Sequence, residues 1–274
     1  VSRKYNHAWD QFDQRAYAKG GWVLHMLRSQ LGEDLFRRCV THYLKKNALS
    51  SVDTHDLQQA FEEITGLSLL PFFDQWVHNA GHPDLKVSYD WMPHEKLAKI
   101  SVEQLQAAAA SKSKEKDPAK NAAGPPLFDL PLTLRFVGPD FVVDRDVVVN
   151  KKMQDFYVPL PDKPDVVRFD ARTQVLGSID FEKPKEMLYT QLQLEDDVVG
   201  RLLAADALND KEDQQSIDAL QDALQRDSFF GVRRQAAQAL ADIGTSKALA
   251  ALIESRDQPD ARVRRQVVRA IGSF

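Results

Sequence analysis

The sequence has 274 residues, of which 43% are hydrophobic and 28% are charged, and its formal net charge is −4. This length allows about two domains, or three small ones, and the composition is that of an ordinary globular protein. There is no basic stripe of the kind that a nucleic-acid partner requires, no apolar run near the ~20 residues of a membrane helix, and only one cysteine, so an internal disulfide is excluded.

The chain begins at Val1 instead of a methionine, and no secretory signal is visible. We therefore expect the natural amino terminus to lie before this sequence. The sequence does not distinguish a cytoplasmic from a periplasmic or secreted location.

Residues 1–83 are predicted to be helical. Apolar side chains recur at helical spacing from Ala16 to Leu31, and a second apolar helix follows directly. Asp53 or Thr54 can cap a third helix, because short polar side chains accept hydrogen bonds from the free amides of a first turn. Pro71 suits the first turn of a fourth helix.

Residues 84–192 are predicted to form strands. Apolar and polar side chains alternate with period two over several short runs, as between Leu130 and Phe136, and Gly, Pro and Asp separate the runs. This pattern is typical of an antiparallel β-sandwich. Residues 107–126 are rich in Ala, Lys and Pro and have no large apolar side chain, so we expect a mobile loop there.

Residues 193–274 are predicted to be helical and repeated. The segment VRRQAAQALADIG from Val232 returns as VRRQVVRAIG from Val263, an offset of 31 residues, and RLLAADAL from Arg201 is a looser third copy. A period of this size indicates a helical solenoid in which each helix pair is buried by its neighbours. The D-x-x-V-R unit at Asp260 resembles a HEAT-like repeat, and we expect the carboxy terminus to be truncated within a repeat.

Two passages carry a family resemblance. RAYAKGGWVLHMLRSQLGEDLF, from Arg15, resembles the Y-x-K-G-x-x-x-L-x-x-L segment of the zinc aminopeptidases of the membrane alanyl aminopeptidase and leukotriene hydrolase family. FFDQWVHNAGHPDL, from Phe72, resembles the W-x-x-x-x-G-x-P end of that family's catalytic domain. The repeats are similar to those of a bacterial branch of the family.

The resemblance implies a multidomain α+β architecture. Residues 1–83 would be the helical end of a catalytic domain, residues 84–192 a β-sandwich, and residues 193–274 a HEAT-like solenoid. The chain would then be the carboxy-terminal portion of a zinc metallo-aminopeptidase, a hydrolase that removes amino-terminal residues from peptides. The alternative is a non-catalytic scaffold of the same family, which binds protein partners through its repeats.

One catalytic residue is implied by the resemblance, namely Tyr17. The tyrosine of this family motif donates a hydrogen bond to the oxyanion of the tetrahedral intermediate. Helical periodicity by itself would favour a second interpretation, in which Tyr17 merely packs on its helix. Lys19, Gly20 and Gly21 are interpreted as structural, with the glycines allowing close packing against another element.

No metal site is expected in this sequence. The H-E-x-x-H motif of zinc peptidases is absent, so the zinc of the whole protein would be held by residues outside this chain, and the fragment would be inactive alone. His78 and His82 are four residues apart, but they have no glutamate between them and a helix-breaking glycine and proline nearby. They are interpreted as ordinary histidines, as are His25, His42 and His94; Cys39 is expected in the core.

Paired arginines recur in the repeats, as Arg233–Arg234 and Arg264–Arg265. They could form a basic ridge for an acidic partner. The interpretation that we favour is structural, with arginines pairing with aspartates of adjacent repeats, because acidic residues in the same region offset their charge.

Overall fold

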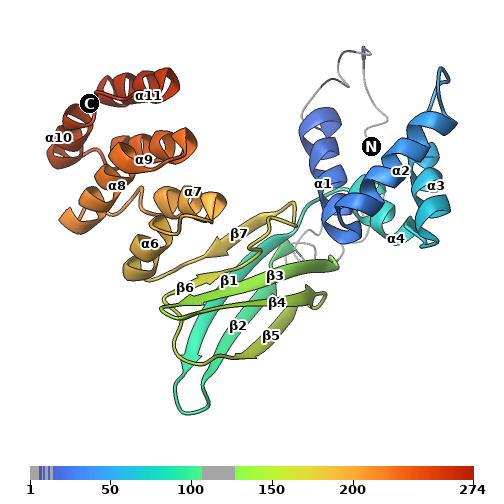
Figure 1. The fold of residues 1–274 in the computed structure, drawn as a ribbon, viewed down its shortest axis with the longest axis horizontal. Helices are drawn as coiled ribbons and strands as arrows, with labels where there is room; N and C mark the ends of the chain where they lie inside the picture. Colours follow the sequence, from blue (N-terminus) through green and yellow to red (C-terminus); the bar gives the residue numbers. More distant parts are fainter. Residues whose placement is uncertain (1–5, 8, 10–11, 13–14, 107–126) are drawn as a thin grey trace, which may run out of the picture.

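The computed structural model describes residues 6–7, 9, 12, 15–106 and 127–274. Figure 1 shows a group of helices, a two-sheet sandwich and a stack of helices, in chain order, with the sandwich between the two helical parts. The predicted multidomain α+β architecture is confirmed. The predicted loop at 107–126 lies outside the described residues, and the division at residues 83 and 192 stays a prediction.

The first part is helical, as predicted. Asp53 caps α3 by accepting from the amides of His55 and Asp56, and the Asp56 carboxylate accepts from the Asp53 amide in return. Gly66 ends α3 with a φ of 70°, a conformation that glycine adopts without strain. The elements are η2 (Arg15–Lys19), α1 (Gly20–Leu31), α2 (Glu33–Lys46), α3 (Thr54–Thr65), α4 (Leu70–Phe73) and η3 (Asp74–His78), where η2 and η3 are π-helical turns.

The second part is a sandwich of two sheets. One sheet has the strand order β5-β2-β1-β7, and the other has the order β4-β3-β6. The strands are β1 (Asp84–Met92), β2 (Leu97–Gln104), β3 (Leu130–Gly138), β4 (Phe141–Val149), β5 (Met153–Pro159), β6 (Val166–Arg168) and β7 (Ser178–Phe181).

The period-two pattern buries one face of each central strand. Leu130, Leu132, Leu134 and Phe136 of β3 are at most 2% exposed. Thr133 points to the opposite face yet is also fully buried, and its hydroxyl donates a hydrogen bond to Asp146 of the adjacent strand β4. The alternation therefore predicts the core face, whereas the burial of the other face depends on what covers it.

Two expectations for the sandwich were wrong in part. The strand pair β1–β7 is parallel, not antiparallel, because β7 enters this sheet after the chain has crossed from β6 in the other sheet. Residues 185–192, which we expected in the strand-rich segment, form helix α6 (Lys185–Leu192). Leu188 and Leu192 lie one turn apart in that helix, Met187 is next to Leu188, and all three are buried, which is a helical spacing.

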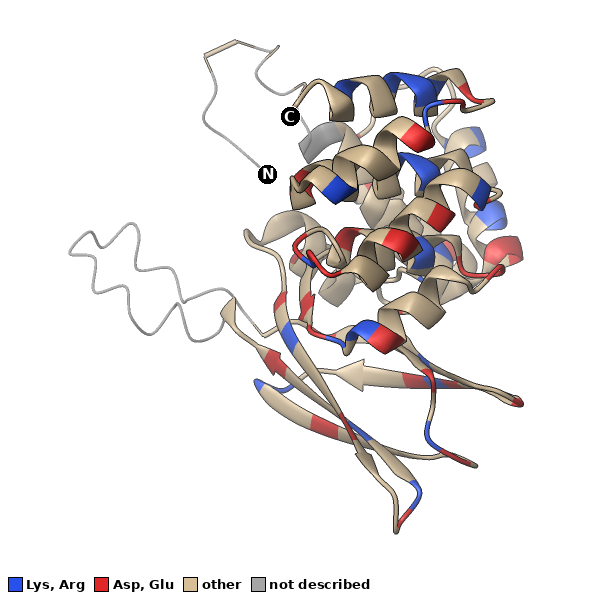
Figure 2. Ribbon diagram, turned by 90° about the vertical axis from the view of Figure 1, so that its left-hand side faces the viewer, with Lys and Arg blue, Asp and Glu red and all other residues tan. Residues whose placement is uncertain are grey.

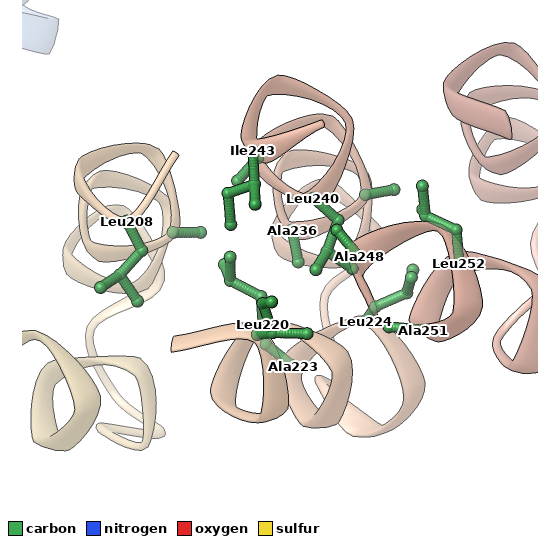
Figure 3. Close-up of a cluster of buried hydrophobic side chains, with 14 of the residues drawn as sticks. Leu208, Leu220, Ala223, Leu224, Ala236, Leu240, Ile243, Ala248, Ala251 and Leu252 are labelled. Carbon is green, nitrogen blue, oxygen red and sulfur yellow. The ribbon is translucent and has the colours of Figure 1, made fainter. Parts of the chain in front are cut away.

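The third part is a stack of helices, as the 31-residue offset predicts. Helices α9 and α11 contain the two copies of the repeated motif, and α9 packs against both α7 and α11. Small and branched side chains fill the space between the helices, among them Leu220, Leu240 and Leu252 (Figure 3). The further helices are α7 (Val198–Ala207), α8 (Gln214–Arg226), α9 (Phe230–Ile243), α10 (Ser246–Glu254) and α11 (Ala261–Ile271).

Helix α1 belongs to two cores at once. Its Val23 and Met26 pack with the interior of the sandwich, together with Trp76 of η3. Its Leu27 packs instead with Phe61 in the core of the helical part. This shared burial holds the first helices firmly against the sandwich. Within the described ranges, no helix has the length and apolar character needed to span a bilayer.

Candidate functional site

Tyr17, the candidate catalytic residue, lies in the π-helical turn η2 directly before α1. Its side chain is exposed, with a relative accessibility of 68%. Its ring centroid lies 6.2 Å from that of Phe12, which in turn lies 5.2 Å from Trp9. Single π-helical turns of this kind occur frequently at functional sites in proteins.

The chemistry available to Tyr17 follows from its exposure. A phenol hydroxyl is a neutral donor, and among the described residues none forms a hydrogen bond with this one. With respect to the described residues, the hydroxyl is therefore available to donate to a bound molecule. Most of the side chain is accessible although its ring lies near Phe12, and the catalytic role of Tyr17 stays a prediction.

The helix that follows Tyr17 is anchored to the sandwich. His25 of α1 makes a hydrogen bond through Nε2 to the carbonyl oxygen of Thr173, at 2.9 Å, in the loop after β6. The same helix contributes Val23 and Met26 to the sandwich core. The turn that carries Tyr17 therefore continues into a helix fixed by apolar burial and by one polar contact.

The loop that receives His25 is itself held in a fixed shape. The Asp170 carboxylate is buried and accepts hydrogen bonds from the amides of Gln174, at 2.7 Å, and Val175, at 3.0 Å. Burial raises the pKa of Asp170, and these two amides oppose that shift. Thr173 has a φ of 55°, which is unusual for a branched residue and shows how closely the loop is constrained.

The close packing expected at the two glycines that begin α1 is not found at Gly21. A side-chain carbon added there would meet no atom within 4 Å. Gly21 is followed by Trp22, whose ring lies at the side of His25 with the centroids 5.8 Å apart. Gly21 therefore makes no close contact, and the first buried residue of α1 is Val23.

The histidines do not gather into a metal site. His78 is the last residue of η3 and Asn79 is already extended, so His82 does not share a helical face with it. His42 instead contacts Glu63 at 2.7 Å, beside Lys46. Within the part of the chain that the structure describes, no group of three or more His, Cys, Asp or Glu side chains could hold a metal ion.

Comparison with known proteins finds two family models that match parts of this chain. Residues 2–76 match the peptidase family M1 domain, and residues 185–272 match HEAT repeats. We call residues 2–76, which this family model matches, the M1 segment. This M1 segment contains Tyr17 and the whole of α1, α2 and α3.

Curated relatives match this chain over short stretches. It is 35% identical over 86 residues to a leucyl aminopeptidase of Saccharolobus solfataricus, covering 31% of this chain and 11% of that protein. It is 40% identical over 76 residues to aminopeptidase 2 of Candida albicans, covering 28% of this chain and 8% of that protein. A tricorn protease-interacting factor F2 of Thermoplasma volcanium is 34% identical over 79 residues, 29% of this chain and 10% of that protein. The chain thus spans about a tenth of the length of these relatives.

The fold itself is shared more widely. The crystal structure of Legionella pneumophila aminopeptidase A, determined in complex with aspartic acid, superimposes with a TM-score of 0.65. That similarity covers 97% of this chain and 30% of the Legionella chain, at 17% identity. It therefore extends the likeness in fold beyond the M1 segment to the sandwich and the repeats.

The cysteine of the M1 segment lies in its core, as expected. Cys39 is fully buried beside Leu27 and Phe61. Burial raises the pKa of its thiol, so the reactive thiolate form is disfavoured. Cys39 is accordingly a packing residue and not a second candidate for catalysis.

In the HEAT repeats, the first arginine of each pair makes internal hydrogen bonds. The Arg264 guanidinium donates from Nη1 to the carbonyl oxygens of Gln258, at 2.7 Å, and Pro259, at 2.9 Å. Arg233 donates in the same way to the carbonyl oxygen of Asp227, one repeat earlier. These contacts tie each helix to the turn before it. The structural role that we favoured therefore holds for Arg233 and Arg264, with backbone carbonyls and not aspartate side chains as acceptors, whereas Arg234 and Arg265 make no such contact with the described residues.

One arginine does pair with the aspartate of an adjacent repeat. Arg201, 3% exposed, donates from Nε to the Asp227 carboxylate at 2.7 Å. This pair lies at the side of a pocket of about 550 Å³, whose wall includes Glu195 and Asp222. Sequence reasoning missed this pocket, because the residues around it come from three separate segments of the repeats.

Proposed function

We propose that the whole protein containing these residues is a zinc-dependent metallo-aminopeptidase that removes amino-terminal residues from peptides. The observation that carries the proposal is the M1 match over residues 2–76 together with an exposed Tyr17 within it. The relatives named as aminopeptidases support the same activity. Because they are about ten times longer than the matched region, the activity belongs to the whole protein and not to this chain alone.

The residues present here do not fit a zinc ion. The sequence has no H-E-x-x-H motif, and the described residues contain no cluster of three ligating side chains. In our proposal the zinc ligands lie outside this sequence. The chain by itself is then expected to bind no stoichiometric zinc and to show no peptidase activity.

Tyr17 would act on the oxygen of the scissile carbonyl. Attack on a peptide carbonyl places negative charge on that oxygen, and a donor already in position stabilises the charge. The phenol suits this role because it donates without carrying charge itself. The anchoring of α1 through His25 and the sandwich core would hold the hydroxyl in place while the charge develops.

The test begins with the gene that encodes this chain. We expect the codons before Val1 to specify H-E-x-x-H and a downstream glutamate. In the protein expressed with that region, Tyr17→Phe should lower kcat by about 10²–10³ while KM changes little. Tyr43→Phe, in α2 and away from the site, is the matched control and should leave kcat unchanged. A Tyr17→Phe enzyme with full activity would refute the assigned role.

The alternative is a non-catalytic scaffold of the same family. The HEAT repeats favour it, since stacked helix pairs present long surfaces to protein partners. Upstream codons that lack the zinc ligands would decide for the scaffold. In that case the repeats, and not Tyr17, would carry the function.

A further inference from the structure

Two consecutive repeats place a pair of arginines at the same position. Arg233 and Arg234 lie in the first turn of α9, and Arg264 and Arg265 lie 31 residues later in α11. The first arginine of each pair donates to backbone carbonyls of the preceding turn. The first arginine of each pair therefore stabilises the fold, whereas this role does not account for the second arginine.

The second arginine of each pair is exposed. Arg234 and Arg265 have no ion pair or hydrogen bond with any other described residue, and the same holds for Arg269, one turn further along α11. Other exposed arginines of the repeats are engaged. Arg226 pairs with Asp222 at 3.1 Å, and Arg262 pairs with an aspartate at 2.7 Å.

The charge around these arginines is not neutralised locally. Residues 230–274 contain eight basic and four acidic side chains, whereas residues 195–229 contain three basic and ten acidic ones. The solenoid is therefore acidic at its start and basic at its end, and Figure 2 shows both kinds of charge over the stacked helices. An acidic ligand would be attracted to the basic end and repelled from the other.

The two helices that carry the free arginines lie side by side. Gln238 of α9 accepts a hydrogen bond from Gln266 of α11 at 2.8 Å. Neighbouring helix axes are ~8–10 Å apart, so arginines at equivalent positions are separated by about that distance. In an extended segment of polyproline II conformation three residues make one turn and span ~9 Å, so carboxylates at positions i and i+3 lie on one face and would match the spacing.

We propose that Arg234, Arg265 and Arg269 form a docking surface for an extended acidic segment of a protein partner. Guanidinium groups bind carboxylates through two parallel hydrogen bonds, so such a surface would hold an acidic segment in a defined orientation as well as add to its affinity. The exposed Val268, between the last two arginines, would offer apolar contact. The surface does not depend on peptidase activity, so its test is independent of the proposed function.

The test uses this chain and a fluorescent capped peptide with two glutamates three residues apart. Binding is followed by anisotropy at low salt and again at high salt. We expect the double variant R234Q/R265Q to weaken binding roughly tenfold, because two charge-assisted contacts are lost. R226Q is the matched control and should bind as the unchanged protein does. Because none of the substituted side chains in the double variant supports the fold, its thermal melting should also be unchanged.

Three outcomes would overturn the proposal. The double variant could bind the peptide as tightly as the unchanged protein. A matched peptide with glutamines in place of the glutamates could bind equally well. A single-stranded oligonucleotide could bind more tightly than the peptide with the same dependence on Arg234 and Arg265, which would assign the surface to nucleic acid.

Discussion

Arg168 of β6 and Asp197, the residue that caps α7, form a buried ion pair between the sandwich and the HEAT repeats. The Arg168 Nε donates to the Asp197 carboxylate at 2.7 Å, and the two side chains are 2% and 11% exposed. The same carboxylate accepts from the amide of Gly200 at 2.7 Å, which begins the helix. One aspartate therefore both starts the repeats and joins them to the sheet.

Removing the charge of Asp197 is expected to destabilise the protein strongly. In Asp197→Asn the amide oxygen can still cap α7, but Arg168 remains buried with no counter-charge. Breaking a buried pair on one side typically costs about 3–5 kcal/mol. Urea unfolding measures the loss, and Asp222→Asn, in an exposed pair, is the control that should change little. Equal effects of the two substitutions would contradict the account.

Lys183 lies close to this pair and should make stability depend on pH. Burial and the nearby Arg168 lower the pKa of Lys183 to about 7, against the partial opposition of Asp197. Its Nζ donates to Gln191 at 2.7 Å and lies 4.8 Å from the centroid of the Phe181 ring.

The sign of that dependence follows from proton binding. Between pH 7 and the ordinary lysine pKa of 10.5, the unfolded chain binds a proton at Lys183 that the folded chain does not. The free energy of unfolding therefore rises with pH in this window, by up to ~1.4 kcal/mol per pH unit from this group. Lys183→Met should remove that slope in urea titrations at several pH values. A variant with the same slope as the unchanged protein would exclude Lys183 as its source.

Patterns in the sequence predicted those elements that can be recognised from residues close together along the chain. The alternation from Leu130 to Phe136 identified β3, and the offset between Val232 and Val263 identified the stacked repeats. Asp53 was recognisable as a cap, because its hydrogen bonds reach amides only two and three residues away. In each case the interactions that decide the structure lie within one element or one repeat.

Contacts between distant segments could not be predicted in this way. Arg168 and Asp197 are 29 residues apart, and His25 and Thr173 are 148 apart, so no pattern links them. The parallel pairing of β7 depends on the path of the chain between the two sheets. Tyr17 became a candidate only through a family resemblance, because helical periodicity by itself favours a packing role for it.

The two arginines of one repeat should differ in their effect on stability. Arg233→Met would leave the half-buried Asp227 carbonyl without its donor, and the loss of one such hydrogen bond costs about 1 kcal/mol. Arg234→Met, at the neighbouring position, removes an exposed side chain without a contact and should leave stability nearly unchanged. Urea midpoints of the two variants give a direct comparison. Equal destabilisation by both would show that the internal contact of Arg233 does not matter for the fold.

The contact between His25 and Thr173 should control the order of the segment that carries Tyr17. In His25→Ala the loop carbonyl loses its donor, and α1 keeps only its apolar anchors. We expect a loss of about 1 kcal/mol in stability and faster amide exchange in η2 and the first turn of α1. Hydrogen exchange followed by mass spectrometry locates the change. His55→Ala, on the exposed side of α3, should alter exchange only locally, and unchanged exchange around Tyr17 in His25→Ala would mean that apolar burial alone positions this segment.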